Sequence, residues 1–215
     1  MSTDRKPATP HTRARNGAAT VPLDSADFDR ATRGFIADIA DRRVTDEAGR
    51  VVMDANNYDF LDRSNPAPDS VHPSLWRHAQ LNHHRGLYEV IPGVWQVRGY
   101  DISNITFIRG TKGWLVIDPL TTAATARAGY ELVSEHVEKL PVTAVIYTHS
   151  HTDHFGGVLG VTSQEAVDRG ECVVIAPEHF LHEVVGENVI AGFAMGRRAL
   201  YQFGPLLPAG PQGHV

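Results

Sequence analysis

The most informative stretch of this chain reads Tyr147-Thr148-His149-Ser150-His151-Thr152-Asp153-His154-Phe155-Gly156-Gly157, and it continues the apolar run Val142–Tyr147. Imidazole nitrogens and carboxylate oxygens suit a borderline cation such as zinc. In an extended backbone, residues two apart point to the same side, so His149 and His151 can hold one ion together. Asp153 and His154 follow a turn and point elsewhere. The stretch therefore predicts two adjacent ions, each completed by later residues and a shared water. The competing interpretation is a surface loop whose histidines only exchange protons.

The segments on either side of this loop predict an α/β fold. Short β-branched or aromatic runs separated by turn residues indicate an antiparallel meander, over Leu87–Ile91, Val94–Arg98, Asn104–Arg109 and Trp114–Ile117. A helix over Thr122–Leu140 and a buried strand over Val142–Tyr147 follow. Beyond the loop we expect a helix over Ser163–Asp168, a strand over Cys172–Ala176 and a helix from about Pro177. The histidine-rich loop thus comes where a strand ends, as sites in α/β sheets commonly do.

The amino-terminal part is predicted to be different in kind. Residues 1–22 contain proline, threonine and arginine without periodicity, which indicates a disordered tail. Apolar residues at three- to four-residue spacing predict a helix from Asp24 or Ser25 to about Ala40, and Val51–Met53 a short strand. Pro73 is suited to begin a helix that ends before Gly86. We therefore divide the chain into a tail (1–22), a helical extension (23–86) and a main domain (87–215).

The composition limits the classes of partner. A net charge of −5, with 42% hydrophobic and 21% charged residues, gives no reason to expect nucleic acid or an anionic membrane as partner. No apolar run has the length of a secretory signal or a membrane span, which favours a cytoplasmic location without excluding export. The single cysteine, Cys172, is predicted to be a small buried hydrophobic residue.

Other polar residues are weaker candidates. Asp118 ends a predicted strand and could orient a ligand histidine through its second nitrogen, or it could simply begin a turn. His179 and His182 are three residues apart on a predicted helix and could reach one ion. His214 lies in a Gly/Pro-rich end and is expected to play no part. Arg197 and Arg198 could bind an anion such as sulfate, although a solvated helix face explains them as well.

The histidine-rich stretch resembles the signature of the metallo-β-lactamase fold, and Asp118 resembles the earlier aspartate motif of that superfamily. Further segments resemble alkyl sulfatases of the type that hydrolyse dodecyl sulfate. They are Ser74–Arg77, Gln80–Asn82, Gly86–Glu89, Val97–Asn104 (Val-Arg-Gly-Tyr-Asp-Ile-Ser-Asn), Trp114–Leu120, Glu187–Val189 and Ala194–Arg198.

The resemblance implies the first half of an αββα sandwich and a homodimeric hydrolase that uses two zinc ions and a metal-activated water to release sulfate and alcohol. His149 and His151 would bind one zinc, and Asp153 and His154 the other. Asp153 would also be the catalytic residue, because it would hold both metal and hydroxide geometry. Asp118 would act from behind the ligands.

In such sulfatases the remaining ligands, two glutamates and a histidine, follow later than Val215. We therefore expect an amino-terminal fragment that is inactive on its own. The alternatives are another hydrolase of the same superfamily, such as a thioesterase or lactonase, and a non-catalytic truncated product that binds zinc.

Overall fold

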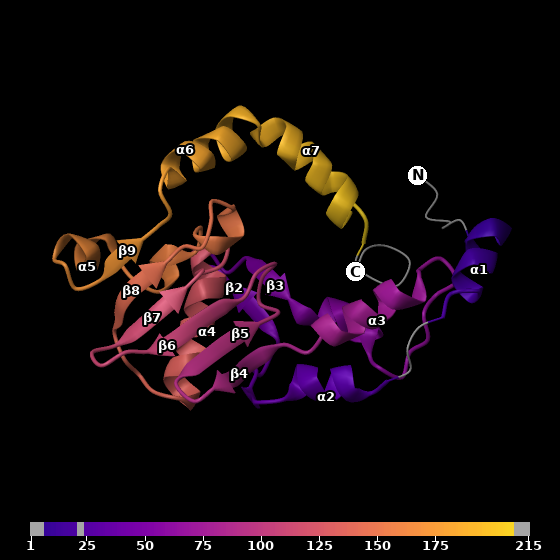
Figure 1. Ribbon diagram of the computed structural model, residues 1–215, viewed down its shortest axis with the longest axis horizontal. Helices are drawn as coiled ribbons and strands as arrows, with labels where there is room; N and C mark the ends of the chain where they lie inside the picture. The colour runs from indigo at the N-terminus through magenta and orange to yellow at the C-terminus, as the bar shows by residue number, and fades with distance from the viewer. Residues whose placement is uncertain (1–6, 21–23, 209–215) are drawn as a thin grey trace. The chain divides into compact units, whose positions relative to one another are not determined.

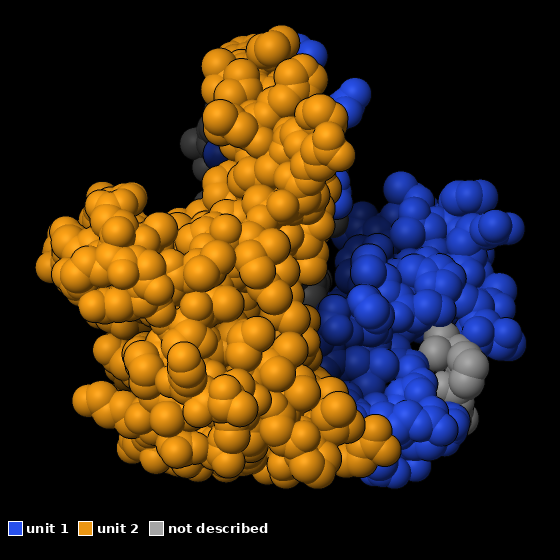
Figure 2. Space-filling model, turned by 60° about the vertical axis from the view of Figure 1, so that its left-hand side comes forward, with its two compact units in different colours: residues 1–32, 56–84, 196–215 blue, residues 33–55, 85–195 orange. Residues whose placement is uncertain are grey.

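The computed structural model describes residues 7–20 and 24–208, which form two compact units. Unit 1 comprises residues 1–32, 56–84 and 196–215, and unit 2 comprises residues 33–55 and 85–195 (Figure 2). The histidine-rich loop and the predicted main sheet both belong to unit 2. His214 lies outside the described residues. The predicted domain limits at 22 and 86 stay a prediction.

Within the described residues, unit 2 is organised around a seven-stranded sheet in the order β1-β4-β5-β6-β7-β8-β9 (Figure 1). Its strands are β1 (Phe35–Ala37), β4 (Gly86–Ile91), β5 (Val94–Arg98), β6 (Ile105–Arg109), β7 (Trp114–Ile117), β8 (Val142–Ile146) and β9 (Val173–Ile175). Neighbouring strands from β4 to β7 are antiparallel, whereas β8 is parallel to both β7 and β9. The predicted meander and the α/β class are confirmed.

The helix α4 (Ala123–His136) makes the crossover between the parallel strands β7 and β8. Thr122 caps it, because its hydroxyl oxygen accepts a hydrogen bond from the Thr125 N–H at 3.1 Å. The face of α4 with Ala126 and Val133 is fully buried against the sheet. Gly129 allows close packing, since a Cβ there would lie 3.2 Å from the Ile105 side chain. The loop that follows β8 is thereby held on a rigid sheet.

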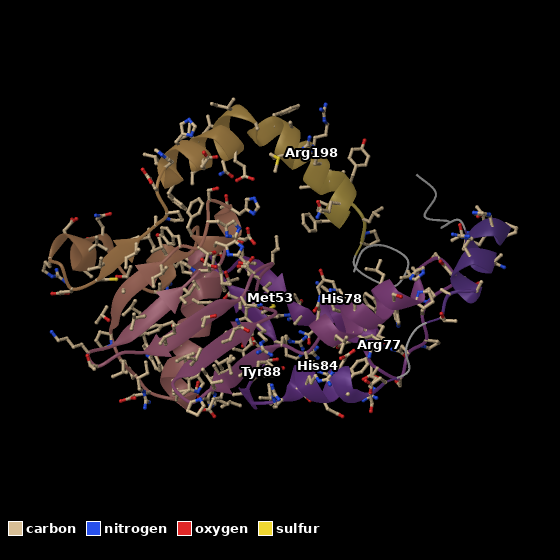
Figure 3. All side chains as sticks on the ribbon, viewed as in Figure 1. Met53, Arg77, His78, His84, Tyr88 and Arg198 are labelled. Atoms are coloured by element: carbon tan, nitrogen blue, oxygen red, sulfur yellow. The ribbon has the colours of Figure 1, made fainter. Side chains whose placement is uncertain are left out.

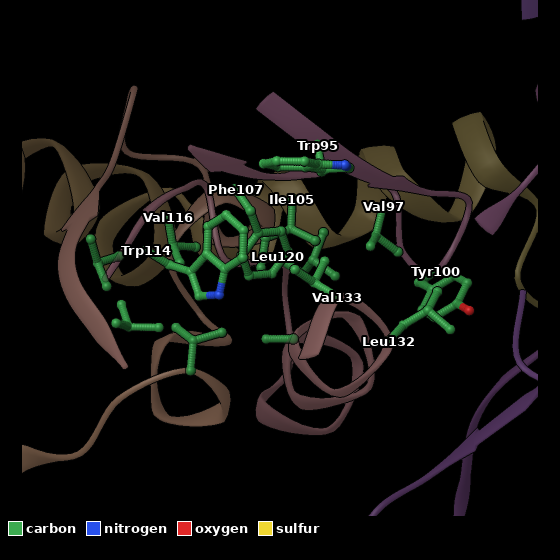
Figure 4. Packing of buried hydrophobic residues seen from close by; sticks show 14 of the residues in the cluster. Trp95, Val97, Tyr100, Ile105, Phe107, Trp114, Val116, Leu120, Leu132 and Val133 are labelled. Atoms are coloured by element: carbon green, nitrogen blue, oxygen red, sulfur yellow. The ribbon is translucent and has the colours of Figure 1, made fainter. Parts of the chain in front are cut away.

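The core of unit 2 lies between this sheet and α4 (Figure 4). Trp114 is fully buried and packs edge-on against both Trp95 and Phe107, with ring centroids 5.5 and 6.1 Å apart. Full burial of a large apolar side chain stabilises a fold by about 2–3 kcal/mol. Cys172 is 1% exposed and is part of this core, as expected.

The remaining elements of unit 2 are short. They are β2 (Arg43–Thr45), which pairs with β3 (Val51–Asp54), the turns η2 (Thr152–His154) and η3 (Val158–Gly160), α5 (Gln164–Asp168), α6 (Phe180–Val185), the π-helical turn η4 (Gly186–Ile190) and the start of α7 (Gly192–Phe203). None of the helices in the described ranges is long and apolar enough to cross a membrane.

The predicted helix from Asp24 or Ser25 to Ala40 is wrong in its second half. The helix α2 covers only Ala26–Thr32, and residues 35–37 form β1, an antiparallel partner of β4. Gly34 has φ of 78° and its carbonyl oxygen accepts a hydrogen bond from Glu89 N–H at 2.8 Å. A Cβ on Gly34 would lie 2.1 Å from the Glu89 carbonyl oxygen, so this turn requires glycine. After the turn, the chain pairs with β4 as a strand instead of continuing the helix that the apolar spacing predicts.

Unit 1 also corrects one expectation. The predicted disordered tail contains α1 (Pro10–Gly17), because Thr9 caps the helix through the Thr12 N–H at 3.1 Å and Pro10 occupies its first position. Unit 1 further contains most of η1 (Ala55–Leu61), and it contains α3 (Pro73–Asn82), the helix predicted from Pro73. Figure 3 labels Arg77 and His78 on α3 and His84 just after it.

Candidate metal centre

The histidine-rich loop begins where β8 ends and folds back over residues 119–122. Gly157 donates its N–H to the carbonyl oxygen of Leu120 at 2.8 Å. A Cβ on Gly157 would lie 2.1 Å from the Pro119 carbonyl oxygen, and one on Gly156 would lie 2.4 Å from that of Thr121. These two glycines therefore let the loop lie directly on the segment that follows β7 and Asp118.

Asp118 ties the two segments together from beneath the loop. Asp118 is 8% exposed. Its backbone φ is 53°, an uncommon value for a residue other than glycine, and it turns the chain at the end of β7. The carboxylate accepts three hydrogen bonds, from Thr148 N–H at 2.8 Å, from the Thr148 hydroxyl at 2.7 Å and from His154 Nδ1 at 2.8 Å. Asp118 therefore contacts a predicted ligand histidine, rather than only beginning a turn.

This network assigns the tautomers of two histidines. His154 donates its Nδ1–H to Asp118, so in the neutral ring Nε2 carries the lone pair. The single hydroxyl hydrogen of Thr148 is donated to Asp118, so the contact of 2.9 Å between Thr148 Oγ1 and His149 Nδ1 requires the histidine to donate. The neutral ring of His149 therefore also presents an Nε2 lone pair.

The four predicted ligand side chains meet in two pairs. His149 Nε2 lies 3.1 Å from His151 Nδ1, and His154 Nε2 lies 3.2 Å from Asp153 Oδ2. A tetrahedral zinc ion bound at about 2.0–2.1 Å separates two of its ligand atoms by about 3.3–3.4 Å. The rings of His149 and His154 are 4.0 Å apart at their centroids, so the two pairs adjoin. The side chains are thus grouped as His149 with His151 and Asp153 with His154.

The pair formed by His154 and Asp153 brings two acceptor atoms together when the His154 ring is neutral. The lone pairs of His154 Nε2 and Asp153 Oδ2 face one another without a hydrogen to share, and such a contact is repulsive unless a proton or a cation lies between them. Within the described residues, no group of three or more histidine, cysteine, aspartate or glutamate side chains surrounds a single point. Since catalytic zinc sites have three protein ligands, each pair fits an ion that takes at least one further ligand. The metal and its ligand set stay predictions.

The structure adds neighbours that the spacing did not indicate. Glu187 Oε1 lies 3.0 Å from His151 Nε2, and the Thr152 hydroxyl donates to Asn188 Oδ1 at 2.9 Å. Ser103, which is 8% exposed, donates its hydroxyl to the carbonyl oxygen of Asp153. The first two lie 36 residues along the chain from their partners and Ser103 lies 50, so no local pattern could reveal these contacts.

Asp101 fixes the loop that carries Ser103. Its carboxylate accepts from Thr121 N–H at 3.0 Å, from the Thr121 hydroxyl at 2.7 Å and from the Thr125 hydroxyl at 2.9 Å. The β5–β6 loop is thereby joined to the start of α4. Since Gly156 lies against Thr121, the same contacts support the histidine-rich loop from below.

The other sequence candidates lie on exposed surfaces. His179 and His182 contact the adjacent Glu178 and Glu183 at 3.6 and 3.3 Å. Arg197 and Arg198 are exposed on α7. At the base of the loop, burial raises the pKa of the Tyr147 hydroxyl, with a smaller contribution from Cys172, so this phenol stays neutral near pH 7.

The chain is similar to known proteins over most of its length. The Metallo-beta-lactamase superfamily matches residues 98–212. The chain is 45% identical over 213 residues to a linear primary-alkylsulfatase from Pseudomonas sp., covering 98% of this chain and 32% of the relative. It is 46% identical over 192 residues to an alkyl/aryl-sulfatase from Saccharomyces cerevisiae, covering 89% of this chain and 30% of the relative.

A solved structure is similar along almost the whole chain. It is the stereoselective inverting sec-alkylsulfatase from Pseudomonas sp., with a TM-score of 0.90 at 45% identity over 98% of this chain and 33% of that chain. The resemblance to alkyl sulfatases is confirmed, and so is the metallo-β-lactamase-like fold class over the aligned region. The chain spans about a third of the length of the curated relatives it matches.

Proposed function

The chain belongs to the metallo-beta-lactamase superfamily, and from that premise we propose that it carries part of the active site of a zinc-dependent hydrolase of alkyl sulfate esters. The observation that carries the proposal is the 45% identity to a linear primary-alkylsulfatase over 98% of this chain. An (R)-specific secondary-alkylsulfatase from Pseudomonas sp. is also 45% identical, over 100% of this chain and 32% of the relative. The reaction is hydrolysis of the ester to an alcohol and sulfate.

Two pairs of side chains are proposed to hold the metal. His149 Nε2 and His151 Nδ1 form one pair, and His154 Nε2 and Asp153 Oδ2 the other, at 3.1 and 3.2 Å. When bound there, zinc supplies a positive charge that draws electron density from a sulfate oxygen and lowers the pKa of a water. The donor set suits zinc, because imidazole and carboxylate are its usual ligands besides thiolate.

The protein's own groups prepare this site. Asp118 holds the Nδ1–H of His154, so the Nε2 lone pair stays turned toward Asp153. Thr148 holds the Nδ1–H of His149 in the same way. Asp153 is the proposed catalytic residue, and Ser103 fixes its backbone by donating to its carbonyl oxygen. The homodimer and the cytoplasmic location stay predictions.

Two measurements test the proposal. The first is the zinc content of the dialysed chain, with Asp153→Ala as the variant that removes a ligand. We expect zinc in the wild-type chain and a lower content in the variant. The second replaces the aligned third of the (R)-specific secondary-alkylsulfatase with this chain and measures sulfate release from alkyl sulfates.

We expect the chimera to release sulfate, and to lose this activity with a chelator or with Asp153→Ala. A folded chimera that binds zinc and releases no sulfate from linear or secondary alkyl sulfates would contradict the proposed substrate. A wild-type chain without zinc, together with an inactive chimera, would contradict the metal site itself.

A further inference from the structure

We propose that Glu187 is a positioning residue of the metal centre, which accepts the Nε2–H of His151 and keeps the Nδ1 lone pair turned toward His149. The proposal rests on the metal site proposed above, to which it adds a residue. Its first support is the contact of 3.0 Å between Glu187 Oε1 and His151 Nε2. Histidines that bind metals commonly donate their other ring N–H to a carboxylate, which sets the tautomer and raises the basicity of the ligand nitrogen.

Glu187 contacts His151 in the same way as Asp118 contacts His154. In both cases a carboxylate oxygen contacts one ring nitrogen, at 3.0 and 2.8 Å, while the other nitrogen faces the second member of its pair. The two nitrogens of an imidazole point away from each other across the ring. Glu187 therefore lies on the side of His151 opposite to His149 and leaves the space within the pair free.

The side chain of Glu187 is suited to this task because it is partly withdrawn from water. It is 24% exposed, whereas His151 is 56% exposed and would otherwise have more freedom to turn. A carboxyl oxygen that accepts from one ring nitrogen of an exposed imidazole selects one tautomer and one ring orientation. Without Glu187, both tautomers of His151 become accessible, and the one with Nδ1–H cannot offer a lone pair next to His149.

Separate contacts hold the segment that carries Glu187 against the loop. Asn188 Nδ2 donates to the Val184 carbonyl oxygen at 3.0 Å, and Asn188 Oδ1 accepts from the Thr152 hydroxyl at 2.9 Å. Phe180, at the start of α6, has its ring centroid 5.3 Å from those of both Tyr147 and Phe155, the residues on either side of the metal-ligand motif. The segment from α6 to η4, which carries Glu187, thus contacts the loop near both of its ends, through Phe180 and through Asn188.

The backbone at Glu187 has an unusual form that fits a functional role. The turn Gly186–Ile190 is π-helical, and the Ala191 N–H donates to the Gly186 carbonyl oxygen at 2.9 Å. Such wide turns are rare, and within helices they occur frequently at functional sites. Here the π turn begins directly after α6 and carries Glu187 and Asn188, whose side chains contact His151 and Thr152.

The test uses the whole chain with 15N-labelled histidine. Long-range 1H–15N spectra of the metal-free protein at about pH 8, above the usual imidazole pKa, report the tautomer of each ring. Zinc affinity is measured in parallel by competition with a chromophoric chelator. We expect His151 to be protonated at Nε2 in the wild type. In Glu187→Ala we expect a mixture of tautomers and an affinity about 10–100-fold lower.

Two further variants separate positioning from folding. Glu187→Gln keeps an oxygen acceptor without the charge, so His151 should keep its tautomer and the affinity should lie between wild type and Glu187→Ala. Glu183→Ala, on the adjacent α6, removes the same charge from a side chain that is 64% exposed and should behave as wild type. His154 should keep its tautomer in all variants, because Asp118 holds it.

The outcomes distinguish the two proposals. A Glu187→Ala chain with the wild-type tautomer of His151 and the wild-type zinc affinity would overturn the role of Glu187 and leave the metal site intact. A wild-type chain that binds no zinc would overturn the metal site, and with it the role given to Glu187. Loss of affinity in Glu183→Ala equal to that in Glu187→Ala would also overturn the proposal, since it would indicate a general effect of charge.

Discussion

Replacement of Asp118 by asparagine should reverse the tautomer of His154 and weaken the metal site. Asp118 accepts Thr148 N–H on Oδ1, and accepts the Thr148 hydroxyl and His154 Nδ1–H on Oδ2. An amide has a single acceptor oxygen. If this oxygen faces the Thr148 N–H, the new NH2 group faces His154 Nδ1, and the ring must then accept there and carry its hydrogen on Nε2.

The magnitude follows from the lost contacts. A hydrogen bond to a charged group contributes about 1.5–3 kcal/mol, and a buried polar group left without a partner costs about 1–3 kcal/mol. We therefore expect the metal-free Asp118→Asn chain to be less stable by about 1–3 kcal/mol. Loss of a carboxylate behind a ligand histidine typically lowers metal affinity about 10–100-fold, which corresponds to about 1.4–2.7 kcal/mol.

Urea denaturation of the metal-free chain, chelator competition and the 15N spectra described above measure the three effects. Asp168→Asn is the matched control, because Asp168 is exposed on α5 and accepts a hydrogen bond from Gln164. An Asp118→Asn chain that retains Nδ1–H on His154 and binds zinc as the wild type does would refute this role of Asp118. Equal losses of stability in both variants would also speak against it.

Three further changes test other parts of the structure. Gly157→Ala should lower the free energy of unfolding, measured in urea, by about 1–3 kcal/mol, because the new Cβ would lie 2.1 Å from a neighbouring backbone carbonyl oxygen. Neutral substitutions usually change stability by less than about 0.5 kcal/mol, so a change of that size would argue against the close approach. Ser103→Ala should lower zinc affinity and cost about 1–2 kcal/mol, since it leaves the Asp153 carbonyl oxygen without this donor; Ser103→Thr should restore part of both. Burial lowers the pKa of His84 below 6.5, with a smaller contribution from Arg63. Stability should therefore fall as the pH drops below about 6.5, because the unfolded chain takes up a proton more readily than the folded chain. In His84→Gln the urea midpoint should depend less on pH in this range, and an unchanged dependence would contradict this role of His84.

Much of the sheet could be predicted because its pairing is local. The strands from Gly86 to Ile117 follow one another through short turns, so period-two patterning and turn residues are sufficient to predict the meander. The edge strand Phe35–Ala37 could not be found in this way. Its apolar residues fit a helical spacing equally well, and its partner lies about 50 residues later in β4. Tertiary pairing overrode the local pattern, as it commonly does at sheet edges.

At Pro10–Gly17, by contrast, local signals predict the observed helix although the composition of the segment does not. Residues 1–22 carry no apolar periodicity, which favoured a disordered tail, yet a threonine cap and a proline at the first helical position are local signals that were available. The capping pattern therefore predicts the structure of this segment better than its composition does. Helix signals of this kind depend on one or two residues, so they are easily outweighed by the character of a whole segment.

The candidate ligands could be named from the sequence because all four lie within six positions, and an alternating backbone already divides them into two pairs. Their spacing carries the chemistry of imidazole and carboxylate, whatever the rest of the fold does. The partners behind them are different. Glu187, Ser103 and the contact from Asp118 to His154 each join residues at least 36 positions apart, across separate strands and turns. Hydrogen bonds over such distances exist only after the sheet, α4 and the α6–η4 segment have packed, so these partners of the candidate ligands can be identified only in the folded chain.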